Sequence, residues 1–239
     1  MKVIPIKGTI VSNNSKWIYE LFEREATAPK DIVLPETGED VEIHINSGGG
    51  DVYAGSEIYT ALRAYSGRVT VKIVGIAASA ASVIAMAGDS VEISPTAQIM
   101  IHNVSSGVYG DHNALEHEAT VLKGFNKSIA SAYVHKTGKA LPDLLELMNQ
   151  TTWFDAEAAV ENGFADKVMF AQEVAPLLVA SETPMIPQDF IERMQATMTP
   201  DVDKIAELVA QKLAEHEPEK TNTENKKATE PSGFGRFAF

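Results

Sequence analysis

The sequence contains no cysteine, and this absence excludes several kinds of chemistry. Disulfide bonds, thiolate nucleophiles and cysteine-ligated zinc are impossible, and a cysteine-free chain suits the reducing cytoplasm. Long apolar runs are also missing. No window approaches the roughly 18 apolar residues of a transmembrane helix, and the start MKVIPIKGTI lacks the apolar core of a signal peptide. We therefore expect a cytoplasmic protein that does not enter a membrane.

Positive charge is scarce as well. The chain has 20 Lys and Arg against 33 Asp and Glu, which gives a net charge of −13, and its basic residues do not cluster. Such a chain repels a phosphate backbone, so we expect no nucleic-acid partner. Apolar residues make up 44% of the sequence and charged residues 22%, as in ordinary globular domains. The 239 residues suit one domain of about 150 to 200 residues with extensions.

Strand and helix patterns alternate along most of the chain. The stretch VEIHIN places Val41, Ile43 and Ile45 on one face of a strand. Trp17, Ile18, Leu21 and Phe22 form one face of a helix capped by Asn14 or Ser15. We expect further strands at 2–10, 69–74, 91–93, 98–101 and 167–170, and further helices at 52–65, 79–87, 111–136, 141–149 and 155–162. Repeated βα units predict an α/β fold with parallel pairing.

The character of the sequence changes near residue 173, so we expect a first domain at 1–172. Residues 173–214 are predicted to be a connector followed by an amphipathic helix, whose apolar stripe needs a partner. Residues 215–239 are predicted to be a disordered polar linker that ends in the aromatic peptide GFGRFAF, which is typical of a docking segment. The stripe of the helix consists of Val202, Ile205, Leu208, Val209 and Leu213.

Three polar features follow expected strands, where α/β proteins bind their ligands. Ser79 lies in GIAASAAS, and the small residues two positions on either side favour a tight turn that presents a nucleophile. The alternative is a small-residue helix that packs closely on a neighbour. Gly48 to Gly50 supply unobstructed N–H groups that suit an oxyanion hole. The alternatives there are a flexible turn or a phosphate loop, although the phosphate-loop motifs are absent.

The third feature is His102, which ends the expected strand QIMIH and is placed to accept a proton from Ser79. The alternative is a structural histidine. His117 and Glu118 begin like the zinc motif H-E-x-x-H, but Val121 stands at its last position. We therefore expect no metal site and no cofactor. Ser82 is a competing hydroxyl that we expect to be buried.

Four ordered motifs together resemble the proteolytic subunit of the Clp protease family (ClpP), serine peptidases with a crotonase-like fold. They are INSGGGDVYAGSEIY, GIAASAAS, QIMIHN and DAEAAVENGFADKV, and the resemblance covers about residues 2–168. It implies a spiral of ββα units with a long protruding helix at 111–136. It also implies that this helix assembles the chain into a homo-oligomeric ring.

The resemblance further implies roles for single residues. Ser79 is the nucleophile and His102 the general base, while the backbone N–H groups of Gly50 and Ala80 form the oxyanion hole. A protein or peptide substrate lies extended as an added strand.

Two positions depart from the family pattern. Gly48 stands where the family usually has proline, which loosens that loop. Thr151 stands where the third, acidic catalytic member is expected. The site then works as a dyad, helped by the Thr151 hydroxyl or by water, or another carboxylate such as Asp155 takes the place of the acid. Loss of the acid costs about 10⁴ in rate in a related triad.

The polar and aromatic tail is similar to that of bacteriophage head-maturation (prohead) proteases, which process scaffold or capsid protein in the host cytoplasm. A serine endopeptidase of this type is the favoured interpretation. One alternative is a catalytically inactive scaffold or assembly protein, which Thr151 supports. A second is an ATP-dependent Clp subunit with an ATPase partner. A third is an acyl-CoA enzyme of the crotonase fold, against which the pairing of Ser79 with His102 speaks.

Overall fold

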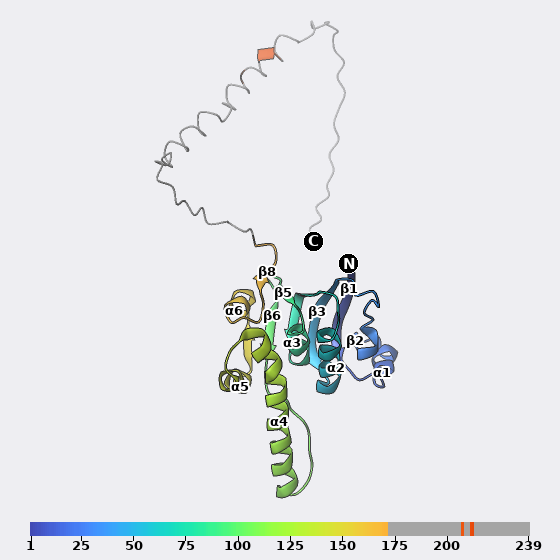
Figure 1. Ribbon diagram of the computed structural model, residues 1–239, viewed down its shortest axis with the longest axis vertical. Coiled ribbons are helices and arrows are strands. Elements are labelled where there is room, and N and C mark those ends of the chain that lie inside the picture. The colour runs from blue at the N-terminus through green and yellow to red at the C-terminus, as the bar shows by residue number, and fades with distance from the viewer. Residues whose placement is uncertain (172–206, 208–210, 213–239) are drawn as a thin grey trace, which may run out of the picture. The chain divides into compact units, whose positions relative to one another are not determined.

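The computed structural model describes residues 1–171, 207 and 211–212. The predicted connector, amphipathic helix and aromatic tail otherwise lie outside the described residues. Figure 1 shows a sheet with helices packed against it and one long helix projecting away. In the described part of the chain, no helix has the length and apolar character needed to cross a bilayer.

The strands form one sheet in which almost every pair is parallel, as predicted for an α/β fold. The main path of the sheet has the order β2-β1-β3-β4-β5-β8, while β6 pairs with the far end of β4. Only β7 runs antiparallel among the described strands, and it pairs with β6. The strands are β1 (Lys2–Ile10), β2 (Ala26–Thr27), β3 (Val41–Gly50), β4 (Val69–Ala78), β5 (Ser90–Ile93), β6 (Gln98–Ile101), β7 (Thr152–Phe154) and β8 (Lys167–Val168).

The helices follow the predicted order closely. Two short elements, β2 and β7, were not predicted because two or three residues carry no periodic pattern. A single 3₁₀ turn at Pro29–Asp31 also escaped prediction. The helices are α1 (Lys16–Leu21), α2 (Val52–Arg63), α3 (Ala80–Ala85), α4 (His112–Thr137), α5 (Leu141–Asn149) and α6 (Ala156–Glu161).

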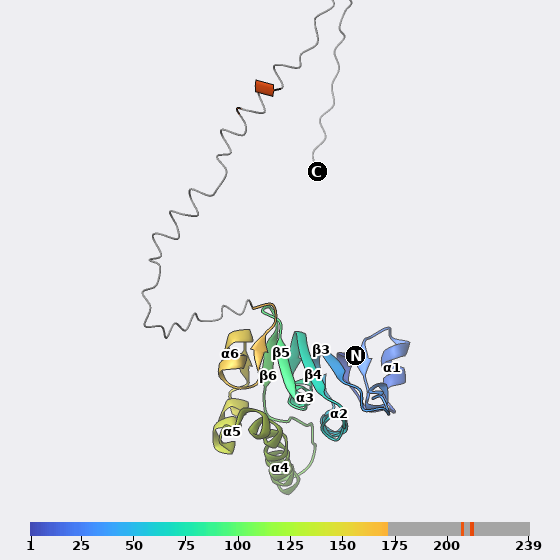
Figure 2. The ribbon, with the colours of Figure 1, turned by 45° about the horizontal axis from the view of Figure 1, so that its top comes forward.

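The core lies between the sheet and the helices α2 and α3, which pack on it (Figure 2). The predicted alternation in β3 is confirmed, because Val41, Ile43 and Ile45 are all fully buried. Burial of such side chains stabilises the fold by about 1.5 to 3 kcal/mol each. The other face of β3 carries the half-buried residues Glu42 and His44. One face of this strand therefore joins the core and the other meets solvent.

Two strands run further than predicted. The predicted ends were Asn46 for β3 and residue 74 for β4, but β3 continues through the glycines to Gly50 and β4 continues to Ala78. The glycine stretch is held as a strand because Gly49 pairs with Thr9 and Gly50 pairs with Ile10 of β1. Glycine has a low strand propensity, so only the neighbouring strand reveals this extension.

The apolar residues of α1 do not face the core, contrary to the expectation for an amphipathic helix. Trp17, Leu21 and Phe22 are 58%, 67% and 70% exposed. Ser15 occupies the N-cap position, but its side chain makes no capping hydrogen bond. None of its residues is buried, because the helix lies on the surface beside β2, the edge strand of the sheet.

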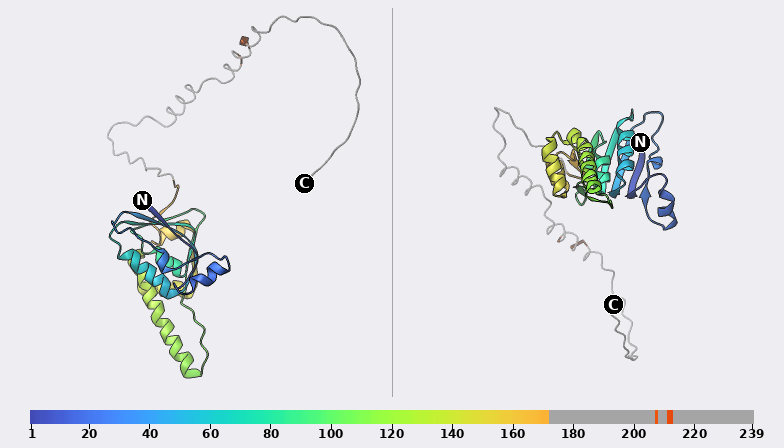
Figure 3. Two further views of the ribbon diagram at one scale, coloured as in Figure 1. Left: turned by 90° about the vertical axis from the view of Figure 1, so that its right-hand side faces the viewer. Right: turned by 90° about the horizontal axis from the view of Figure 1, so that it is seen from below.

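The long helix α4 is present within one residue of its predicted ends and has 26 residues. Its N-terminal part projects from the domain, accompanied by the segment that leads into it (Figure 3, left). Its C-terminal part enters the core with Ala130, Ala132 and Tyr133. Gly138 ends it in the left-handed conformation at φ +70°.

Candidate functional site

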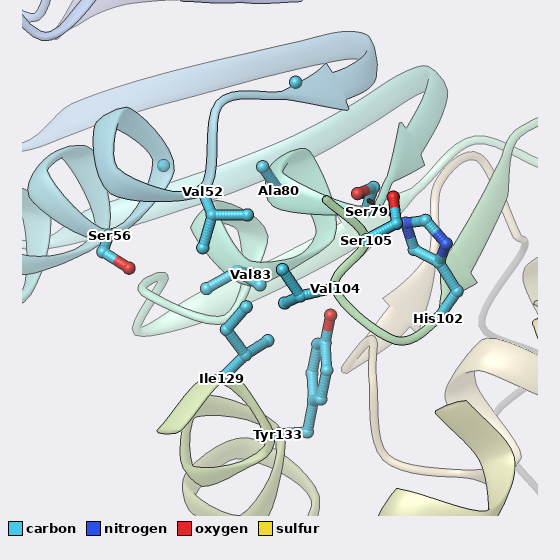
Figure 4. A pocket seen from close by; sticks show the side chains of 12 residues that line it. Val52, Ser56, Ser79, Ala80, Val83, His102, Val104, Ser105, Ile129 and Tyr133 are labelled. Atoms are coloured by element: carbon cyan, nitrogen blue, oxygen red, sulfur yellow. Dashed lines mark hydrogen bonds between the residues drawn. The ribbon is translucent and has the colours of Figure 1, made fainter. Parts of the chain in front are cut away.

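The three polar features predicted at strand ends meet at one place in the fold. Gly50 ends β3, Ser79 follows β4, and His102 follows β6. All three line a single pocket, together with Ala80 of α3 (Figure 4). The parallel neighbours β3, β4 and β6 end at the same edge of the sheet, which explains why residues far apart in sequence come together.

Ser79 lies in a strained turn between β4 and α3. Its φ of 55° and ψ of −125° are rarely adopted by a residue with a side chain, and such geometry costs on the order of 1 to 3 kcal/mol. Two hydrogen bonds help to fix the turn. The Ser79 N–H donates to the Met100 carbonyl at 2.9 Å, and the Ser82 hydroxyl donates to the Ser79 carbonyl at 2.6 Å. The strained turn raises the serine at the pocket, as predicted for a nucleophile.

Small residues around Ser79 let other elements approach the turn. A Cβ atom on Gly49 would lie 2.6 Å from the Ala78 carbonyl oxygen and 2.7 Å from the Ser79 Cβ atom. On α2, a Cβ atom on Gly55 would lie 3.0 Å from that of Ala80. All six residues of α3 are buried. The segment therefore packs tightly, as one interpretation of GIAASAAS expected, and its serine also lines the pocket.

His102 contacts the serine directly. Its Nε2 atom lies 2.7 Å from the Oγ atom of Ser79, a normal hydrogen-bond length. The ring is half-buried, and it comes from β6, the strand that also accepts the N–H of Ser79. In this arrangement a neutral imidazole accepts the hydroxyl proton when the oxygen attacks an electrophile.

Thr151 directly precedes β7, the antiparallel neighbour of β6. The last residue pair of these strands is Ile101 with Thr152, and His102 and Thr151 each lie one residue beyond it. Among the described residues no hydrogen bond joins the two side chains, and Thr151 is exposed at φ 53°. The threonine at the position predicted for the acid therefore makes no hydrogen bond that would hold the His102 ring.

Asp155, the other carboxylate considered for this role, is used elsewhere. It is the N-cap of α6, and its side chain accepts a hydrogen bond of 2.9 Å from the Ala158 N–H. The structure therefore assigns Asp155 to helix capping and does not bring it to His102.

Gly50 and Ala80 lie on the wall of the pocket next to Ser79. Ala80 is the first residue of α3, where a backbone N–H has no partner within the helix. Gly50 has φ +150°, and a Cβ atom there would lie 2.1 Å from the Ile10 carbonyl oxygen. Glycine is therefore required at position 50, and its N–H remains unobstructed by a side chain.

The other side chains that line the pocket are uncharged; four are aliphatic, and Ser56, Ser105 and Tyr133 add hydroxyl groups. Figure 4 shows these side chains extending from Ser79 and His102 toward Ser56, with the Tyr133 ring below them. A pocket of this kind accommodates an uncharged side chain beside the serine. The apolar residues are Val52, Val83, Val104 and Ile129.

Tyr133 is one of the pocket residues that the sequence did not indicate as part of the site. Ser82 is fully buried, as expected, and its hydroxyl lies 2.8 Å from the Tyr133 hydroxyl. Desolvation by burial strongly raises the pKa of Tyr133, so the hydroxyl keeps its proton. The helical spacing of Ile129, Ala132 and Tyr133 indicates burial, but no pattern in the sequence indicates the pairing with Ser82.

The other histidines that the structure describes do not line the pocket. His44 is on the opposite face of β3, where it contacts Glu42 at 3.0 Å. His112, His117 and His135 belong to α4. Among the described residues, no group of three or more histidine and carboxylate side chains is arranged to hold a metal ion.

Comparison with known proteins gives consistent matches. The model of the Clp protease family matches residues 31–172, which include Ser79, His102 and Thr151. This match begins after β1, although β1 pairs with β3 in the same sheet. The ATP-dependent Clp protease proteolytic subunit 2 of Tropheryma whipplei is 29% identical over 132 residues, 54% of this chain and 73% of that protein. The ATP-dependent Clp protease proteolytic subunit of Bacteroides fragilis is 32% identical over 136 residues, 56% of this chain and 66% of that protein.

Proposed function

The chain belongs to the Clp protease family, and we propose that it is a serine endopeptidase with Ser79 as nucleophile and His102 as general base. One observation carries the proposal: the contact of 2.7 Å between His102 Nε2 and Ser79 Oγ at the mouth of a pocket. The alternative, a purely structural His102, does not explain why the histidine contacts a serine in a strained backbone conformation beside a pocket.

The chemistry follows from this geometry. The substrate lies extended beside the end of β3, and main-chain hydrogen bonds hold it there. Ser79 Oγ attacks the carbonyl carbon while His102 takes the hydroxyl proton, and the N–H groups of Gly50 and Ala80 receive the developing oxyanion. When the C–N bond breaks, His102 donates that proton to the leaving amine. Water then hydrolyses the acyl-enzyme by the same route.

The uncharged pocket beside Ser79 favours some substrate side chains over others. We propose that it takes an uncharged side chain next to the cleaved bond, because Val52, Val83 and Ile129 offer no partner for a charge. His102 works without an acid to hold its ring, since Thr151 occupies that position. We therefore expect slow turnover.

Slow turnover suits a protease that makes few cuts in each substrate, and we propose a bacteriophage head-maturation protease that acts on scaffold or capsid protein in the host cytoplasm. The C-terminal sequence supports this role. In this proposal the peptidase domain spans 1–172, a connector and helix span 173–214, and a linker with a docking peptide spans 215–239. We also propose that the projecting part of α4 joins subunits into a ring. Stable, stoichiometric co-purification with a Clp ATPase would contradict the phage role.

The first test is covalent labelling. The parent, Ser79→Ala and Ser66→Ala are treated with a fluorophosphonate probe, and adducts are mapped by mass spectrometry. Ser66 is an exposed serine outside the pocket, so its variant serves as the matched control. We expect labelling of the parent and of Ser66→Ala at Ser79, and none of Ser79→Ala.

Absence of labelling in a folded parent would contradict the proposal and favour the inactive scaffold protein. A second measurement addresses the acyl-CoA alternative. Coenzyme A should leave the melting temperature of the parent unchanged, whereas a clear increase would indicate an acyl-CoA site.

A further inference from the structure

We infer that Ser82 and Tyr133 are positioning residues that orient the oxyanion-binding N–H of Ala80, an inference that rests on the proposed function. Neither side chain reaches the reacting atoms, because both act through the backbone of Ser79. Together they tie the nucleophile turn to α4, whose Tyr133 follows Ser82 by 51 residues in the sequence.

The direction of the hydrogen bonds follows from counting donors. A serine hydroxyl has a single proton, and that of Ser82 is donated to the Ser79 carbonyl at 2.6 Å. Ser82 therefore accepts from Tyr133, whose hydroxyl lies 2.8 Å away. Both side chains are at most 1% exposed, so water does not replace either bond. The result is a directed chain from Tyr133 to Ser82 to the Ser79 carbonyl.

The Ser79 carbonyl has further donors. The N–H groups of Ser82 and Val83 lie 3.0 and 3.3 Å from the same oxygen. The hydroxyl bond is the shortest of the three, and it arrives from a side chain that is itself anchored to α4. The backbone bonds belong to the first turn of α3, whereas the hydroxyl chain connects that turn to a separate element.

Fixing this carbonyl also fixes the next N–H. The peptide unit between Ser79 and Ala80 is planar and trans, so its C=O and N–H point in opposite directions. Because the Ser79 carbonyl is held toward Ser82, the Ala80 N–H points away from Ser82. Ala80 lines the pocket, so this N–H is available to an oxyanion there. The strained φ and ψ of Ser79 mean that this peptide relaxes if it is not held.

The test separates positioning from simple stabilisation. Tyr133→Phe keeps the ring, which contacts Phe164 edge-on at a centroid distance of 5.7 Å, and removes only the hydroxyl. Ser82→Ala removes the link to Ser79. The matched control is Tyr65→Phe, because the Tyr65 hydroxyl also donates to a backbone carbonyl, that of Glu39 at 2.6 Å, but outside the pocket.

The maximal rate of fluorophosphonate labelling and the half-saturating probe concentration are measured well below each melting temperature. Oxyanion donors act in the transition state, so we expect the maximal rate to fall with half-saturation unchanged. Ser82→Ala should lower the maximal labelling rate about 10- to 100-fold, which is less than the 10²- to 10³-fold loss expected when a whole oxyanion donor is removed. Tyr133→Phe should lower it about 3- to 10-fold, and the double variant should match Ser82→Ala because Tyr133 acts through Ser82.

Three results would overturn the inference while leaving the proposed function intact. These are a labelled parent with unchanged rates in both variants, a change in half-saturation alone, and losses that multiply in the double variant. An unlabelled parent instead defeats the proposed function. Crystal structures of the parent and Ser82→Ala then decide the positioning claim, since an unchanged Ser79–Ala80 peptide overturns it and a rotated one supports it.

Discussion

The Nε2 atom of His102 lies 2.7 Å from the Oγ atom of Ser79, although the two residues follow different strands and are 23 positions apart. Replacing His102 with Gln keeps a similar volume but removes the proton acceptor. We expect the labelling rate of Ser79 to fall about 10²- to 10⁴-fold. His112→Gln, on the exposed start of α4, serves as the control and should label like the parent. Full labelling of the His102 variant would exclude its role as the base.

Adjacent glycines should respond differently to alanine. Gly49→Ala forces a side chain into φ +93° and within 2.7 Å of Ser79 Cβ, so we expect a loss of at least about 1 to 3 kcal/mol in unfolding free energy and little labelling. A Cβ atom on Gly48 meets nothing within 4 Å, and this residue has no positive φ. Gly48→Ala should therefore be stable and labelled. Urea unfolding and probe labelling measure both effects, and equal behaviour of the two variants would contradict the prediction.

A carboxylate introduced at position 151 should activate the site. Thr151→Asp adds a carboxylate one residue beyond the Ile101–Thr152 pair, on the side of His102, and aspartate tolerates the left-handed backbone found there. We expect the labelling rate to rise at least tenfold, within the roughly 10⁴-fold effect of the acid in a related triad. Gln150→Asp adds the same charge one residue earlier and should have no such effect. A folded Thr151→Asp protein without any increase would show that position 151 does not reach the histidine.

Asp155 should contribute to stability and not to catalysis. Asp155→Asn keeps an N-cap acceptor for the Ala158 N–H, so both unfolding free energy and labelling rate should stay near those of the parent. Asp155→Ala loses the cap and should cost about 1 kcal/mol, measured by urea unfolding. A large drop in labelling for Asp155→Asn would instead identify Asp155 as the missing acid.

Glu42 should make the fold sensitive to acid. Hydrogen bonds from Lys72 and then His44 lower the pKa of Glu42, so the folded state favours the ionised carboxylate. The ionised Glu42 contributes fully to the stability of the fold above the ordinary carboxyl pKa of about 4.3. This contribution is lost as the pH falls through the lowered pKa of Glu42 in the folded state. Glu42→Gln should therefore cost on the order of 1 kcal/mol at pH 7 and progressively less below pH 4. Glu57→Gln, exposed on α2, is the control, and a pH-independent difference for Glu42→Gln would refute the assignment.

Much of the fold follows from short-range pattern. Val41, Ile43 and Ile45 alternate with polar neighbours, and that alternation alone predicts a strand with one buried face. Ser79 and His102 were found because the ends of neighbouring parallel strands meet, so a rule about topology brings together residues that are distant in sequence.

Other features depend on partners that the sequence does not reveal locally. The glycines of β3 form a strand because β1 pairs with them. The apolar side chains of α1 remain exposed because this helix lies beside the edge strand β2 and not over the core. The bond between Ser82 and Tyr133 joins α3 to α4, and the spacing of either helix alone does not predict it.

The long helix α4 divides into two parts with different local stability. Residues near Tyr133 lie in the core, so we expect their amide protons to exchange with solvent through global unfolding. The projecting start of the helix around Leu115 is exposed, so we expect its amides to exchange through local opening. Ser79 is tied to the slowly exchanging part. Fraying at the tip of α4, or remodelling of that tip during evolution, therefore leaves the geometry of the nucleophile unchanged.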